Sequence, residues 1–166
     1  MKSPSYKSEI AKLAQQLGEV LLHRGASVTL AESCTGGGIA KAITSVPGSS
    51  KWFEYGFVTY ANEAKHSLLG VDNKVLQQQG AVSQQVVEKM AQGAIQASGA
   101  DYAIAVSGIA GPDGGTTDKP VGTVWMCWVG PDKNLSQRFQ FTGDRLAIRE
   151  QAIKISLQEL LQHIDE

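Results

Sequence analysis

Apolar residues recur every three or four positions in three long parts of the chain, and this spacing predicts amphipathic helices. The first part runs from Ile10 to Leu21 and is followed by Gly25, a residue type that often ends helices. The second follows Ser83, which is suited to cap a helix N-terminus. The third is the end of the chain, where Thr142 or Asp144 is expected to open the last helix.

Short runs rich in β-branched and aromatic residues alternate with the helical patterns, and they predict strands. These runs are residues 27–31, 56–60 and 102–108, followed by a hairpin of 121–130 with 135–141, and shorter helices are expected at 38–44 and 62–70. The run 102–108 is apolar almost throughout, which is typical of a central strand covered on both faces. We therefore predict an α/β fold, a three-layer α/β/α sandwich with a mostly parallel, mixed sheet, formed by residues 1–166 as a single domain.

Composition narrows the possible functions. The chain has 166 residues, 42% of them apolar, and its 15 basic and 16 acidic residues give a net charge of −1. Nucleic-acid binding usually needs a basic excess, which this chain lacks. A membrane span needs roughly 18 consecutive apolar residues, and no apolar run in the sequence approaches that length. We therefore expect a cytoplasmic protein with neither a nucleic-acid nor a membrane partner. A homodimer is expected because small α/β enzymes are often symmetric dimers.

Three polar clusters follow the three strands that are expected to be parallel. They are ESCTGGG at 32–38, NEAK at 62–65 and SGIAGPDGG at 107–115. Parallel α/β sheets bind ligands beyond the carboxyl ends of their strands. We therefore expect the three clusters to meet at one edge of the sheet and to form a site.

The first cluster contains Ser33 in a strand–glycine–helix turn. Such a turn exposes a serine and directs backbone N–H groups at a developing oxyanion. The alternative, a plain helix N-cap, is favoured by the local sequence alone. The segment is neither a P-loop, nor a dinucleotide fingerprint, nor a G-x-S-x-G elbow. Cys34 is a rival nucleophile, although a small residue packed under the turn is the simpler interpretation.

A serine nucleophile needs a base. His23, His66 and His163 lie away from the glycine loops and are expected at the surface. A lysine can serve if burial lowers its pKa from about 10.4 toward roughly 7–8. Lys65 is the best placed, one turn into a helix that begins at a strand end, and Tyr60 at that strand end could orient it. The alternative is a solvated lysine beside a packed tyrosine.

The remaining polar features suit binding. Arg145 and Arg149 are four residues apart, so they share one face at the start of the last helix, where two guanidinium groups suit a phosphate. Alternatively they are surface charges, with Arg149 paired to a nearby Glu. The loop 107–115 either exposes N–H groups to phosphate or ribose or is a plain connection. No spacing of His, Asp and Glu recommends a metal site.

The ordered motifs AESCTGG, PGSS, VTYANEAK, GAVS, SGIAGPDGG with KPVGTV, and GDRLAIR resemble those of the CinA C-terminal domain family. The resemblance spans about residues 8–162 and is to the stand-alone form, without the molybdopterin-binding-like domain of full-length CinA proteins. It implies hydrolysis of the carboxamide of nicotinamide mononucleotide (NMN) to nicotinic acid mononucleotide and ammonia, in pyridine nucleotide recycling, with no cofactor and no metal.

By motif, the resemblance implies that Ser33 is the nucleophile, Lys65 the general base and Tyr60 its helper. Ser107 stands where many members carry threonine, so a hydroxyl is retained. We expect the oxyanion to be held by backbone N–H groups of residues 34–37. The substrate-binding residues expected from motif and chemistry are Thr35, Gly36, Gly37, Ser49, Ser50, Asn62, Ser107, Gly108, Gly111 and Arg145.

Two other functions are considered. A regulatory module that binds a pyridine nucleotide without turnover would keep the glycine loops and Arg145 but would not need a buried Lys65. An interaction module tied to DNA uptake is suggested only by the family name, and the nearly neutral net charge gives it no support.

Overall fold

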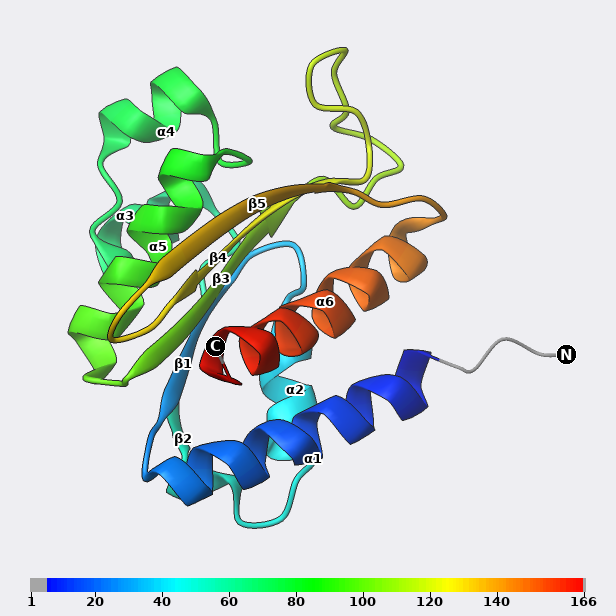
Figure 1. Ribbon diagram of the computed structural model, residues 1–166. Coiled ribbons are helices and arrows are strands. Elements are labelled where there is room, and N and C mark those ends of the chain that lie inside the picture. Colours follow the sequence, from blue (N-terminus) through cyan, green and yellow to red (C-terminus); the bar gives the residue numbers. More distant parts are fainter. Residues whose placement is uncertain (1–5, 166) are drawn as a thin grey trace, which may run out of the picture.

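The computed structural model describes residues 6–165, in which helices and strands alternate over the first two thirds and a hairpin and a long helix follow (Figure 1). The elements are α1 (Tyr6–Arg24), β1 (Val28–Glu32), α2 (Gly38–Thr44), the 3₁₀ helix η1 (Ser49–Lys51), β2 (Phe53–Val58), α3 (Asn62–Leu69), α4 (Asn73–Gln79), α5 (Gln84–Ser98), β3 (Tyr102–Gly108), β4 (Thr123–Val129), β5 (Asn134–Gln140) and α6 (Arg145–Asp165). None of the helices described is long and apolar enough to cross a membrane.

The five strands form one mixed sheet in the order β2-β1-β3-β4-β5. β1 is paired in parallel with β2 and with β3, whereas β4 and β5 are antiparallel to their neighbours. Glu32, the last residue of β1, lies opposite Val58 on β2 and Val106 on β3. The three parallel strands therefore end at the same edge of the sheet, as the sequence predicted.

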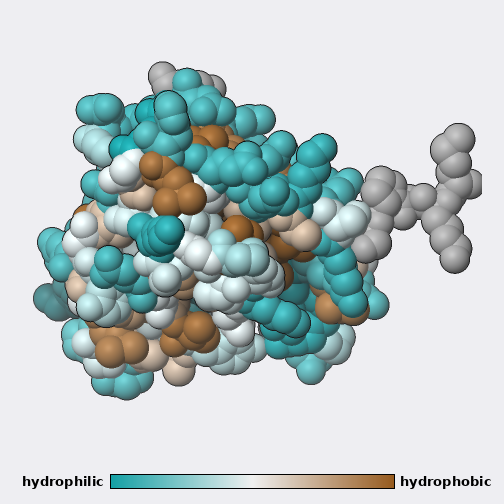
Figure 2. Space-filling model, turned by 90° about the horizontal axis from the view of Figure 1, so that it is seen from below, coloured by the Kyte–Doolittle hydropathy of each residue, from teal (hydrophilic) through white to brown (hydrophobic). Residues whose placement is uncertain are grey.

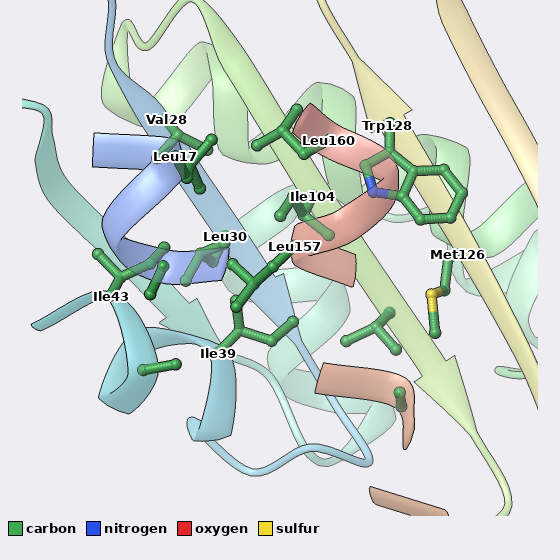
Figure 3. Packing of buried hydrophobic residues seen from close by; sticks show 14 of the residues in the cluster. Leu17, Val28, Leu30, Ile39, Ile43, Ile104, Met126, Trp128, Leu157 and Leu160 are labelled. Carbon is green, nitrogen blue, oxygen red and sulfur yellow. The ribbon is translucent and has the colours of Figure 1, made fainter. Parts of the chain in front are cut away.

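Helices cover both faces of this sheet, which confirms the three-layer sandwich. α1, α2 and α6 lie on one face and α3, α4 and α5 on the other (Figure 1). Alternation along β1 sends Leu30 into the first helical layer and Ala31 toward the second. Leu30 packs with Leu17 and Leu157 in the larger core (Figure 3). The side of the molecule shown in Figure 2 is mostly hydrophilic, with hydrophobic residues in separate patches.

The expected helix ends are mostly confirmed. α1 ends before Gly25, whose φ of 61° suits glycine. The Ser83 hydroxyl accepts a hydrogen bond from the Val86 N–H at 3.3 Å, and the Asp144 carboxylate accepts one from the Ala147 N–H at 2.9 Å. Ser83 therefore caps α5, and Asp144 rather than Thr142 caps α6.

Two elements differ from the sequence prediction. The strand expected at 56–60 is β2 at Phe53–Val58, because Thr59 already leaves the strand after its N–H donates to the Glu32 carbonyl. α4 was not predicted at all. It has seven residues capped by Asp72, and only Leu76 is fully buried, so its apolar pattern is too short to detect.

Candidate active site

The three polar clusters meet around one cavity of about 310 Å³ at the carboxyl edge of the parallel strands. Ser33 enters it directly after β1, Lys65 from α3, and Ser107 from the end of β3. The full lining is Ser33, Cys34, Tyr60, Asn62, Lys65, Ala81, Val82, Ser107, Gly108, Ile109, Ala110, Gly111, Asp113, Gly114 and Arg145. The volume lies at the lower end of the range typical of small-molecule sites.

Lys65 and Ser33 are in direct contact inside this cavity. The Lys65 Nζ lies 3.0 Å from the Ser33 Oγ, 2.7 Å from the Thr59 carbonyl oxygen and 3.3 Å from the Tyr60 carbonyl oxygen. A neutral amine has two N–H groups and one lone pair. If the two N–H groups donate to the two carbonyls, the lone pair is left to accept the proton of the Ser33 hydroxyl.

Burial makes this lysine a usable base. Its side chain is only 1% exposed, and this desolvation lowers the pKa of Lys65 from 10.5 to about 8. At pH 7 roughly a tenth of the molecules then carry the neutral amine, against fewer than about one in a thousand for a lysine of ordinary pKa. The alternative of a solvated lysine is wrong for this position.

Cys34, the rival nucleophile, is poorly suited to that role. Its side chain is buried within the larger hydrophobic core, together with Leu30 and Ile39. Burial raises the pKa of the Cys34 thiol to about 12, so the nucleophilic thiolate is scarce near neutral pH. The interpretation of Cys34 as a packed small residue therefore fits the structure better than a nucleophilic role.

Glu32, which the sequence analysis did not single out, holds the glycine turn in place. Its buried carboxylate accepts hydrogen bonds from the Thr35 hydroxyl at 2.6 Å and from the N–H groups of Ile39 and Ala40 at 2.8 and 3.0 Å. Ser33 is consequently not the N-cap of α2, because Glu32 takes the first free amides of that helix. Glu32 and Ser33 point to opposite faces because they are consecutive at the end of a strand.

Three residues expected to bind substrate are placed differently. Thr35 is fully buried, and its hydroxyl is committed to Glu32. Gly36 and Gly37 line a separate groove between α1, α2 and α6 rather than the cavity. The N–H of Gly36 also donates to the Ser33 carbonyl, so it is not free to hold an oxyanion. None of the three lines the cavity, and their contact with substrate stays a prediction.

Ser49 and Ser50 are also outside the cavity. They belong to η1, which precedes β2, whereas the cavity lies beyond the other end of that strand. Ser49 is buried and Ser50 exposed. From sequence alone, a polar loop at the amino end of a strand cannot be distinguished from one that folds back toward the site. The contact of Ser49 and Ser50 with substrate stays a prediction.

The other expected binding residues line the cavity: Asn62, Ser107, Gly108, Gly111 and Arg145. Arg145 donates to the Gly111 carbonyl at 2.8 Å and to the Tyr60 hydroxyl at 3.0 Å. The Tyr60 ring is largely exposed, and only its backbone carbonyl contacts Lys65. In this structure Tyr60 therefore contacts the lysine through its main chain, and its role as a helper stays a prediction.

The cavity contains one acidic side chain that the sequence analysis missed. Asp113 lies in the loop between β3 and β4, which extends beyond the edge of the sheet in Figure 1. Its only sequence signal was a carboxylate in a glycine-rich loop. Ala81 and Val82, from the connection before α5, add apolar surface. Within residues 6–165, no group of three or more His, Cys, Asp or Glu side chains could hold a metal ion.

The histidines take no part in this cavity. His23 is exposed and His66 is half-buried with its Nδ1 2.8 Å from the Val71 carbonyl oxygen. The expectation of a surface position is wrong for His163, which is 7% exposed because it packs at the end of α6 with its Nε2 3.0 Å from the Lys133 carbonyl oxygen.

Replacing Glu32 by glutamine is expected to lower the free energy of unfolding by about 1–3 kcal/mol. An amide has one acceptor oxygen, so at least one of the buried donors now bonded to the carboxylate loses its partner. Urea denaturation measures the change. The exposed Glu54 on β2 provides the matched control, Glu54→Gln, which should leave stability unchanged. Equal stability of Glu32→Gln and the wild type would contradict the anchoring role of this carboxylate.

The chain matches a known class of domain. The family model described as "CinA C-terminal domain" matches residues 10–164, so the chain belongs to the CinA C-terminal domain family.

Individual relatives agree with this assignment. The chain is 58% identical to "Nicotinamide-nucleotide amidohydrolase PncC" from Pseudomonas putida, over 92% of this chain and 96% of that protein. It is 54% identical to the protein of the same name from Escherichia coli (strain K12), over 93% and 94% of the two chains. Among solved structures, "competence/damage inducible protein CihA" from Agrobacterium tumefaciens matches with a TM-score of 0.91 and 40% identity, over 95% and 96% of the two chains.

Proposed function

We propose that the protein hydrolyses the carboxamide of NMN, giving nicotinic acid mononucleotide and ammonia in pyridine nucleotide recycling. The observation that carries the proposal is the contact of 3.0 Å between the Lys65 Nζ and the Ser33 Oγ, inside a cavity that buries the lysine and lowers its pKa to about 8. The names of the relatives from P. putida and E. coli support the same reaction.

In the first half of the reaction, neutral Lys65 removes the proton of the Ser33 hydroxyl while the Ser33 Oγ attacks the amide carbon. The carbonyl oxygen becomes an oxyanion, which backbone N–H groups beside Ser33 stabilise. The Lys65 ammonium then gives its proton to the amide nitrogen, the C–N bond breaks, and ammonia leaves. The Thr59 and Tyr60 carbonyls keep the lysine nitrogen in place through these proton transfers.

In the second half, a water molecule takes the place of ammonia. Neutral Lys65 removes a proton from this water as its oxygen attacks the acyl carbon. The tetrahedral intermediate collapses, the bond between the acyl carbon and the Ser33 Oγ breaks, and Lys65 returns the proton to Ser33. The product is the free carboxylic acid.

The charges that line the cavity suit the two ends of this substrate. NMN carries a cationic pyridinium ring and an anionic phosphate. Arg145 offers a guanidinium for the phosphate, and Asp113 a carboxylate for the ring cation or the ribose hydroxyls. We place the phosphate near Arg145 and the nicotinamide ring between Asp113 and Ser33.

Replacing Arg145 by alanine is expected to raise KM for NMN by roughly 10–100-fold with a smaller effect on kcat, since a contact to the phosphate is made equally in the ground and transition states. Nicotinamide riboside lacks the phosphate, so its kcat/KM should change much less. Steady-state kinetics with both substrates test this. A control is Arg138→Ala on β5, outside the cavity. An equal loss with both substrates would show that Arg145 acts only by holding Tyr60 and Gly111.

The proposed function is tested by incubating the purified protein with NMN in the presence of EDTA. We expect ammonia and nicotinic acid mononucleotide to appear in equal amounts. Tight binding of NMN without either product would instead support a regulatory nucleotide-binding module.

A further inference from the structure

We propose that Arg149 is a positioning residue that directs the two backbone amides after Ser33 toward the substrate, an inference that rests on the proposed amidase function. Arg149 lies on α6, which packs beside α2 on the same face of the sheet (Figure 1). Its Nε donates to the Cys34 carbonyl at 3.1 Å, and its Nη2 donates to the Thr35 carbonyl at 3.2 Å. A single guanidinium therefore holds two consecutive carbonyls of the turn that carries the nucleophile.

Peptide planarity converts the direction of these carbonyls into the direction of the amides. In a trans peptide the C=O of one residue and the N–H of the next point in opposite directions. Because the Cys34 carbonyl points at Arg149, the Thr35 N–H points away from it. The Thr35 carbonyl, which Arg149 also holds, fixes the Gly36 N–H in the same way. The Gly36 N–H donates to the Ser33 carbonyl, and the direction of that carbonyl in turn fixes the Cys34 N–H.

These two amides donate no hydrogen bond to another backbone group of residues 6–165. Within residues 6–165 the Thr35 N–H has no acceptor and the Cys34 N–H faces only its own thiol, although both residues are buried. Buried backbone N–H groups almost always have a partner, and successive free amides form a concave site for an anion. Arg149 lines the groove formed at Thr35 to Gly38, whereas Ser33 and Cys34 line the cavity. The two amides are therefore suited to hold the oxyanion formed after attack by Ser33.

The surroundings of Arg149 show that this contact is its main role. Within the described part of the chain, no carboxylate forms a salt bridge with Arg149, which corrects the expectation of a Glu partner. Gly36 has a φ of 57°, and a Cβ there would lie 3.0 Å from the Arg149 Nη2, so the turn makes room for the guanidinium. Arg149 does not line the cavity, whereas Arg145 does. A direct contact with the substrate phosphate is therefore assigned to Arg145.

The inference is tested with Arg149→Lys and Arg149→Ala in the NMN assay. Oxyanion donors act mainly in the transition state, so we expect kcat to fall roughly 10–100-fold while KM changes less than about threefold. Arg149→Lys should keep part of the activity, since an ammonium lacks the planar fork that reaches both carbonyls. Millimolar guanidinium chloride should partly restore kcat of Arg149→Ala, and sodium chloride at the same ionic strength should not.

A matched control separates positioning from the general docking of α6. Lys154 is on the same helix and pairs with Glu9 of α1 at 2.9 Å, so Lys154→Ala removes a contact between α6 and α1 without touching the turn and should retain wild-type kcat. Unchanged kcat in both Arg149 variants, or a rise in KM alone, would overturn the inference while the wild type remains active. A wild-type protein that releases no ammonia from NMN would overturn the proposed function and this inference together.

Discussion

Replacing Ser33 by alanine is expected to abolish ammonia release from NMN, lowering kcat by roughly 10³-fold or more. The variant loses the hydroxyl that contacts the Lys65 nitrogen, so no acyl-enzyme can form. The backbone of the turn should be unaffected, since its anchors are the Glu32 carboxylate and the Arg149 guanidinium. The measurement is kcat by ammonia assay, with circular dichroism and a melting curve to show that the variant is folded.

Two control variants test whether the loss of activity is specific to the Ser33 hydroxyl. Ser50→Ala removes an exposed hydroxyl of η1, outside the cavity, and should have wild-type activity. Cys34→Ala removes the neighbouring thiol, whose raised pKa makes it a poor nucleophile, and should lower kcat by less than about tenfold. A Ser33→Ala variant with near-wild-type turnover, or an inactive Cys34→Ala variant that is correctly folded, would contradict the assignment of the nucleophile.

The activity is expected to rise with pH through about 8, the pKa to which burial lowers Lys65. Only the neutral amine can take the proton of Ser33, and its fraction falls about tenfold for each pH unit below the pKa. We therefore expect kcat/KM at pH 6 to be roughly 100-fold below its plateau above pH 9. The Cys34 thiol cannot cause this rise in activity near pH 8, because its pKa is about 12. A flat profile from pH 7 to 9.5, or a falling one, would contradict a lysine base.

A substitution at Lys65 complements the pH profile. Lys65→Met keeps a long, apolar side chain in the buried position but removes the base, so activity should be lost as in Ser33→Ala. Lys89→Met, at an exposed position of α5, should leave both kcat/KM and its dependence on pH unchanged. Substantial activity in a folded Lys65→Met variant would show that another group accepts the proton.

Much of the site was predictable because it follows from two rules about how strands are arranged in a sheet. Alternating strands and helices predicted a parallel sheet, and parallel strands bring the residues after Glu32, Val58 and Val106 to one edge. These two rules predicted that Ser33 and Lys65 lie near each other. The cavity and the contact of 3.0 Å confirm that proximity.

The residues that hold the site were not predictable for a physical reason. Arg149 reaches the turn across 115 positions of sequence, and its pattern on α6 is equally typical of a surface charge. The role of Glu32 depends on the direction of its side chain at the end of β1, which places it against α2. The positions of Ser49 and Ser50 were not predictable either, because their motif does not indicate which end of β2 they occupy.

The most direct test of the central claim is to identify the covalent intermediate during turnover of NMN. We predict that acid quenching followed by peptide mass spectrometry finds the nicotinic acid mononucleotide acyl group on Ser33, and that added hydroxylamine diverts part of the product to the hydroxamate. An acyl group on Cys34, or no acyl-peptide together with no hydroxamate in an actively turning-over sample, would contradict the mechanism.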